Sequence, residues 1–98
     1  MAAGDVKSAI STISNNAYLD VQPPSGEEWC IHNVYYAGAV ELYWYNGTLS
    51  IKIDSETAAG ARFGMVSHVT NGVYLRVKNV SGSNAVLGYD GVCTKAAE

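Results

Sequence analysis

The chain has 98 residues, a formal net charge of −3 and only 15% charged residues. That length suits one domain with a single core, and the acidic balance gives no electrostatic footprint for nucleic acid or an anionic membrane. Ten glycines and seven tyrosines favour an all-β chain with many turns over a helical bundle.

The N-terminal residues lack the basic and then apolar pattern of a secretory signal, and the apolar runs are too short to cross a bilayer. We therefore expect synthesis and retention in a cytoplasm. Residues 1–16 are mostly small and polar, with a weak apolar pattern at Ile10 and Ile13. They predict a loose N-terminal arm, or one short strand that pairs only on assembly. The folded domain is expected over residues 17–95, and a short tail over 96–98.

The first strand of the domain is expected at residues 17–22, and it ends at Pro23 because proline has no N–H for a ladder. A second strand is expected at Glu28–Tyr36, where neither alternating face is purely polar. Both of its faces are therefore expected to be covered, one by the core and the other by a subunit or a partner.

The strongest local signal is the stretch 39–54, two alternating runs joined by Asn46 and Gly47. A two-residue type I′ turn needs positive φ at both central positions, which Asn and Gly adopt readily. This turn places Trp44 opposite Leu49 and Glu41 opposite Lys52, a charge pair worth about 0.2–1 kcal/mol. The expected core face is apolar: Val40, Leu42, Trp44, Leu49, Ile51 and Ile53. The expected outer face is Glu41, Tyr43, Tyr45, Thr48, Ser50 and Lys52.

The segment 54–61 is small and acidic, and it predicts an exposed loop that crosses between sheets. Three further strands are expected, at 62–69, 73–80 and 85–94. A three-residue loop at 81–83 would make the last two a hairpin that pairs Val77 with Leu87 and Leu75 with Tyr89. Short strands at this regular spacing are typical of an antiparallel β-sandwich or a barrel.

Few residues suggest chemistry. The histidines and cysteines lack the spacing of a metal site, so we expect packed side chains and free thiols rather than ligands: His32, His68, Cys30 and Cys93. A Cys30–Cys93 disulfide is the alternative, which requires that their two strands be neighbours. Asp54 and Glu56 are expected to be solvated loop acids rather than calcium ligands. No nucleophile elbow, phosphate loop or HExxH motif is present, so we expect neither an enzyme nor a cofactor.

The aromatic residues carry more information. If Trp44 lies in the core, Tyr43 and Tyr45 point outward, and other residues add to the same face. The candidates for protein contact are Tyr43, Tyr45, Tyr35, Tyr36, Tyr74 and Arg76. Outward tyrosines can be plain strand formers, a protein–protein surface or a sugar-stacking platform. All three interpretations remain open from the sequence.

Five segments that follow one another in order resemble small virion structural proteins of tailed double-stranded-DNA bacteriophages. They are Gly26–Asn33, Glu41–Thr48, Ile51–Asp54, His68–Asn79 and Gly88–Val92. The resemblance spans about residues 25–95, and the nearest group is the capsid decoration, or cement, proteins. Residues 1–16 show no such likeness.

The resemblance implies a jelly-roll β-sandwich on the outer capsid surface of the virion. Oligomers of the chain would bind the major capsid protein and stabilise the particle against the pressure of packaged DNA. It brings no reaction and no cofactor, and no nucleic-acid, membrane or small-molecule partner is expected. The alternative is a carbohydrate- or receptor-binding β-sandwich, for which an association with a tail or a fibre stays open.

Overall fold

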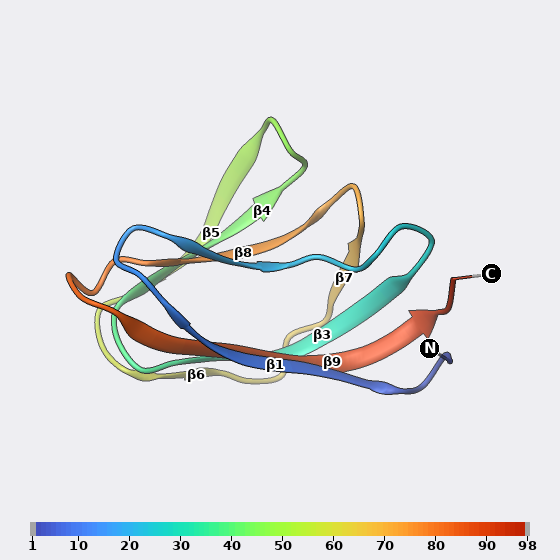
Figure 1. Ribbon diagram of the computed structural model, residues 1–98, viewed down its shortest axis with the longest axis horizontal. Coiled ribbons are helices and arrows are strands. Elements are labelled where there is room, and N and C mark those ends of the chain that lie inside the picture. Colours follow the sequence, from blue (N-terminus) through green and yellow to red (C-terminus); the bar gives the residue numbers. More distant parts are fainter. Residues whose placement is uncertain (1, 98) are drawn as a thin grey trace.

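The computed structural model describes residues 2–97, and its nine strands form two antiparallel sheets packed face to face (Figure 1). The strands are β1 (Val6–Ile13), β2 (Tyr18–Val21), β3 (Glu28–Tyr36), β4 (Val40–Tyr45), β5 (Ser50–Glu56), β6 (Gly60–Arg62), β7 (Ser67–Thr70), β8 (Tyr74–Asn79) and β9 (Ala85–Lys95). One sheet has the order β1-β9-β3-β6, and the other has the order β2-β8-β4-β5. The expected antiparallel β-sandwich is confirmed.

The strand order is that of a jelly roll. The chain passes from one sheet to the other after β1, β2, β3, β5, β7 and β8. Strands β6 and β7 pair with the two halves of β3, at Val34–Tyr36 and Glu28–Ile31 respectively. They therefore act as one interrupted edge, which leaves the eight strand positions of a jelly roll.

The N-terminal segment is not a loose arm. Residues Val6–Ile13 form β1 and pair with β9 within the same chain, from Val6–Val92 to Ile13–Ala85. Ile13 packs against the core, and its carbonyl oxygen accepts a 2.8 Å hydrogen bond from the buried Asn79 amide. The sequence signal is weak because the inward positions of an edge strand can be as small as Ala9. Met1 and Glu98, the ends of the expected arm and tail, lie outside the described residues.

The β4–β5 hairpin forms, but the expected two-residue turn is wrong. Tyr45 pairs with Ser50 and Trp44 with Ile51, so the loop contains residues 46–49. The Asn46 side-chain oxygen accepts hydrogen bonds from the backbone N–H groups of Thr48 and Leu49, at 3.0 and 2.7 Å. This Asx-type arrangement needs positive φ only at Gly47 (94°), so a type I′ turn is not formed.

Half of the expected core face of the hairpin lies at the surface. Val40 and Leu42 are fully buried, whereas Leu49, Ile51 and Ile53 are 71%, 62% and 42% exposed. The reason is that β5 is an edge strand that packs chiefly against β4. Figure 1 shows the hairpin projecting away from the opposite sheet. A bulge at Ile53 also shifts the pairing, so that Leu42 lies opposite Asp54.

The Glu41–Lys52 ion pair is confirmed, with 3.6 Å between the charged atoms. The two residues are not directly opposite one another, because Glu41 pairs with Ser55. Their long side chains bridge the shifted register.

Two other expectations about the connections are wrong, and a third is confirmed in part. Strands β8 and β9 lie in different sheets, so Val77 pairs with Leu42 and Leu19, not with Leu87. The single strand expected at 62–69 is broken between β6 and β7. The segment 54–61 does cross from one sheet to the other, as expected, but it also holds the end of β5 and the start of β6. The missed position of β9 arises because a jelly roll pairs strands that are distant in the sequence.

The core lies between the sheets, where buried apolar side chains of both sheets meet. Tyr89 stacks on Trp29 there, with 6.3 Å between the ring centroids. The indole N–H of Trp29 donates to the buried Glu27 carboxylate at 3.0 Å. Cys30 and Cys93 are both free and buried, as expected, on the neighbouring strands β3 and β9.

Candidate contact surface

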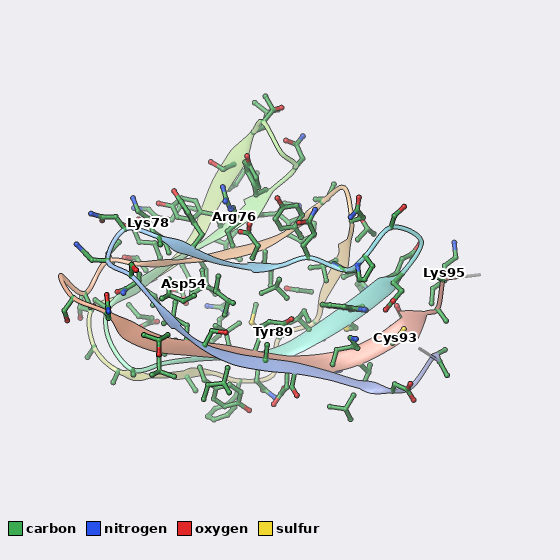
Figure 2. All side chains as sticks on the ribbon, in the orientation of Figure 1. Asp54, Arg76, Lys78, Tyr89, Cys93 and Lys95 are labelled. Atoms are coloured by element: carbon green, nitrogen blue, oxygen red, sulfur yellow. The ribbon has the colours of Figure 1, made fainter. Side chains whose placement is uncertain are left out.

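The outer face of the β2-β8-β4-β5 sheet gathers tyrosines around one arginine. Strand register places Arg76 between Asp20 and Tyr43, and Tyr74 opposite Tyr45. We call this surface the tyrosine–arginine face; it comprises Tyr18, Tyr43, Tyr45, Tyr74 and Arg76. Figure 2 shows Arg76 and Lys78 on this sheet, away from the sheet that carries Tyr89 and Cys93.

Arg76 is the centre of the face. Its Nε donates to Asp20 at 2.6 Å, and its guanidinium carbon lies 4.0 Å from the ring centroid of Tyr18 and 4.4 Å from that of Tyr45. The hydrogen bond to Asp20 raises the pKa of Arg76 further above its ordinary value. The guanidinium is therefore a fixed cation held in place by one carboxylate and two rings.

Tyr43 and Glu41 form a second fixed element beside Arg76. The Tyr43 hydroxyl donates to Glu41 at 2.5 Å. This hydrogen bond, with smaller contributions from burial and from the negative charge of Glu41, raises the pKa of Tyr43 to about 12. The same bond lowers the pKa of Glu41, which also accepts the ion pair from Lys52. Near neutral pH the tyrosine is therefore a neutral donor and the glutamate an anion.

The rings of the face pack edge to face. The Tyr18 and Tyr43 planes meet at 66°, and the Tyr45 and Tyr74 planes at 87°. A shallow hollow of about 300 Å³ lies between four of these side chains and Ser50. Because Arg76 already covers Tyr18 and Tyr45, the hollow does not offer two open, parallel ring faces of the kind on which a sugar stacks.

The structure brings four of the six sequence candidates together: Tyr43, Tyr45, Tyr74 and Arg76. Of these, Tyr74 is nearly covered, so it supports Tyr45 rather than offering contact area. Neither Tyr35 nor Tyr36 lies on this face, contrary to expectation. Tyr35 is exposed on the outside of the opposite sheet, where its hydroxyl donates to Asp90 at 2.7 Å. Tyr36 is 7% exposed in the core, so its candidacy for contact is wrong.

Sequence reasoning missed Tyr18 and Asp20 as members of the face. The alternation of residues 17–22 does place both on one side of a strand. What it does not contain is the pairing of β2 with β8, which brings Asp20 to Arg76 across 56 positions.

The residues considered for metal binding are not brought together. Within residues 2–97 no group of three or more His, Cys, Asp or Glu side chains could hold an ion. The Nδ1 atom of His32 lies 3.1 Å from the Met65 carbonyl oxygen and therefore donates to it, while His68 is exposed on β7. Asp54 accepts an ion pair from Arg62 at 2.7 Å. Over the same residues there is no helix of the length and hydropathy that a membrane span requires.

No protein-family model and no curated protein matches this chain.

Proposed function

We propose that the chain is a non-enzymatic structural protein of a tailed-phage virion. It is a capsid decoration, or cement, protein that binds the major capsid protein on the outer shell and binds copies of itself. The observation that carries the proposal is the tyrosine–arginine face, where Arg76 is held between Tyr18, Tyr45 and Asp20 before any partner arrives.

The residue types of this face and the fixed positions of its side chains both favour a protein-binding role. Tyrosine and arginine are among the residues that most often dominate the binding energy of protein–protein interfaces, as anchors near the centre of the contact. Binding loses less entropy when such side chains are already fixed. On this face the guanidinium, two rings and the Tyr43 hydroxyl all have defined partners within the chain.

The resemblance of residues 25–95 to phage decoration proteins supports the same conclusion, as does the jelly-roll sandwich that it implied. A decoration protein occupies many equivalent sites on one shell. Linked contacts of this kind gain avidity, so a modest interface in each copy is sufficient.

A binding assay with capsid shells tests the proposal. Shells assembled from the major capsid protein of the same phage, without this chain, are mixed with the purified protein and sedimented. We expect the wild-type chain to co-sediment and Tyr45→Ala to bind at least about tenfold more weakly. The matched control is Tyr35→Ala, which removes an exposed tyrosine from the opposite sheet and should bind like the wild type. Loss of binding with Tyr35→Ala alone would assign contact to the other face, and no co-sedimentation of the wild type would overturn the proposal.

One second candidate is a carbohydrate-binding module, which would bind a sugar through the polar groups of the hollow beside Arg76 and Ser50 rather than by stacking on the rings. A glycan array separates the two functions. The carbohydrate-binding hypothesis would be favoured if the chain binds a sugar at micromolar strength, if Tyr45→Ala abolishes that binding, and if the chain has no affinity for shells.

A further inference from the structure

Strand β5 combines an unpaired edge with an uncovered apolar side. It is the last strand of the β2-β8-β4-β5 sheet, so within residues 2–97 one row of its backbone groups has no strand beside it. On its core-facing side, Ile51 and Ile53 are exposed, as is Leu49 at the end of the preceding loop. Figure 1 shows the β4–β5 hairpin standing clear of the rest of the sandwich.

The uncovered side continues as an apolar surface beneath the hairpin. Trp44 separates two hollows, one bordered by Leu49, Ile51 and Val73 and the other by Ile53 and Val66. Val66 is also largely exposed, from the break between β6 and β7. Exposed apolar side chains that adjoin one another mark an interaction site more strongly than scattered ones do.

We propose that this edge pairs with the β5 edge of a second copy of the chain, in an antiparallel arrangement with Ile51 on the two-fold axis. This inference rests on the self-association in the proposed function and names the surface that makes it. The sandwiches would then share one continuous sheet across the dimer.

The sequence of the edge is symmetric about Ile51. Residues 49–53 read Leu-Ser-Ile-Lys-Ile, with apolar and polar positions in alternation. An antiparallel pair centred on Ile51 places Leu49 opposite Ile53 of the second copy, and Ile51 opposite itself. All six aliphatic side chains then fall on the same, uncovered side of the joined sheet.

The residues of β5 whose backbone N–H and C=O groups point outward are those that this register needs. The Asn46 N–H donates to the Leu49 carbonyl oxygen, so residues 46 and 49 are a hydrogen-bonded pair. Because hydrogen-bonded pairs alternate along an antiparallel ladder, Ile51 directs its backbone groups towards Trp44 on β4. Ser50 and Lys52 therefore direct theirs outward. In the proposed register these two residues face one another and can exchange both hydrogen bonds.

Charge is compatible with a second copy as the occupant. No two like charges are opposed, because Lys52 meets Ser50, Asp54 meets Thr48 and Glu56 meets Asn46. Each Lys52 is neutralised by Glu41 of its own chain, so the two lysines that flank the axis do not repel one another strongly. A lysine and a bulge commonly protect edge strands; here the lysine is paired, and the bulge at Ile53 limits pairing to the symmetric segment.

Analytical ultracentrifugation of the full chain tests the proposal. We expect a reversible monomer–dimer equilibrium at micromolar concentrations, and at least a tenfold increase in the dissociation constant for Ile51→Glu. The matched control is Ile10→Glu, on the edge strand β1 and 78% exposed, which should dimerise like the wild type. A chain that stays monomeric up to millimolar concentration, or equal weakening by both variants, would overturn the proposal.

Cysteine substitution tests the register. Opposed residues in a non-hydrogen-bonded pair have Cα atoms about 4.5 Å apart, a distance that a disulfide spans. Ile51→Cys should therefore cross-link to itself under mild oxidation, and Leu49→Cys should cross-link to Ile53→Cys in a mixture. Cross-linking of Ile53→Cys with itself in preference to Ile51→Cys would refute this register. Shell binding is measured on the same variants, so a monomeric chain that still binds shells would overturn this inference and leave the proposed function intact.

Discussion

Tyr43 donates its hydroxyl proton to Glu41, two residues earlier on the same face of β4, at 2.5 Å. One hydrogen bond thus moves two titrations in opposite directions, raising the pKa of Tyr43 to about 12 and lowering that of Glu41. The bond also holds Glu41 where Lys52 reaches it across the hairpin. The tyrosine–arginine face therefore keeps a constant pattern of donors and charges over the physiological pH range.

Removing the Tyr43 hydroxyl should release Glu41. In Tyr43→Phe we expect the pKa of Glu41 to rise towards its ordinary value of 4.5, because the largest cause of its depression is gone. The measurement is an NMR titration of the glutamate side-chain carbonyl carbons. Tyr45→Phe is the control, since Tyr45 has no part in the depression of Glu41. An unchanged Glu41 titration in Tyr43→Phe would show that the neighbouring lysines, Lys52 and Lys78, set the pKa of Glu41.

Alkaline pH should destabilise the wild type more than Tyr43→Phe. The folded state holds the Tyr43 proton more tightly than the unfolded state, whose tyrosine has its ordinary pKa of 10.0. The resulting stability is complete below that value and is lost as pH rises through about 12. Urea unfolding at pH values on either side of this window measures the loss. Other tyrosines with raised pKa values contribute to both proteins, so the difference between them isolates Tyr43; a parallel decline in both would contradict the prediction.

Asn79 should be a large single contributor to stability. Its side chain is fully buried, and its amide donates to the carbonyl oxygens of Ile13 and Ser83, both at 2.8 Å. Its side-chain oxygen accepts from the Ser81 N–H at 2.9 Å. Asn79→Ala removes all three hydrogen bonds and leaves a cavity at a fully buried position, so we expect a loss of about 2–4 kcal/mol in the free energy of unfolding. Denaturant unfolding measures the loss, with the exposed Asn84→Ala as the control at close to zero.

The same variant should loosen β1, because Asn79 ties Ile13 to the opposite sheet. Hydrogen exchange of the β1 amides is expected to accelerate more than exchange in β3. Uniform acceleration across the sandwich would mean that Asn79 acts only on global stability.

Gly91 should not tolerate a side chain. An added Cβ would lie 2.2 Å from the Cys30 carbonyl oxygen and 2.8 Å from the Ile31 Cα, both backbone atoms at the irregular β3–β9 register. We expect Gly91→Ala to lose about 3 kcal/mol or more, since neighbouring backbone must move. Gly72→Ala is the control, because nothing lies within 4 Å of its added Cβ. Equal unfolding midpoints for the two variants would show that the β3–β9 contact is looser than described.

Alternation along single strands was sufficient to predict much of the fold. The bounds of β3 and the burial of Leu75 and Val77 follow from residues that are close in sequence. The outward direction of Tyr43 and Arg76 follows in the same way. These features depend on each strand alone.

The features that the sequence did not reveal depend on pairing between strands that are distant in the chain, or on hydrogen bonds from a side chain to nearby backbone. The Asn46 side-chain oxygen accepts hydrogen bonds from the Thr48 and Leu49 N–H groups, and the turn is therefore longer than the two residues that Asn-Gly predicts. The position of Asp20 beside Arg76 requires the β2–β8 pairing. The N-terminal segment is ordered as a strand, β1, because it pairs with β9. A jelly roll makes such distant pairings the rule, so the tyrosine–arginine face is assembled only by the complete topology.

The position of Trp44 in this topology determines how much it contributes to the free energy of unfolding. Truncation of a fully buried tryptophan to alanine lowers the free energy of unfolding by about 3–5 kcal/mol. Trp44 instead lies half-buried at the open end of the sandwich, opposite the exposed Ile51 and between two hollows. We expect Trp44→Ala to lose only about 1–3 kcal/mol, because part of its surface is already in water. Leu42→Ala, fully buried one position further along the same face, should lose about 2–5 kcal/mol despite its smaller side chain. Urea unfolding of the two variants decides the order, and a larger loss for Trp44→Ala would mean that the hairpin is closed over the core in solution.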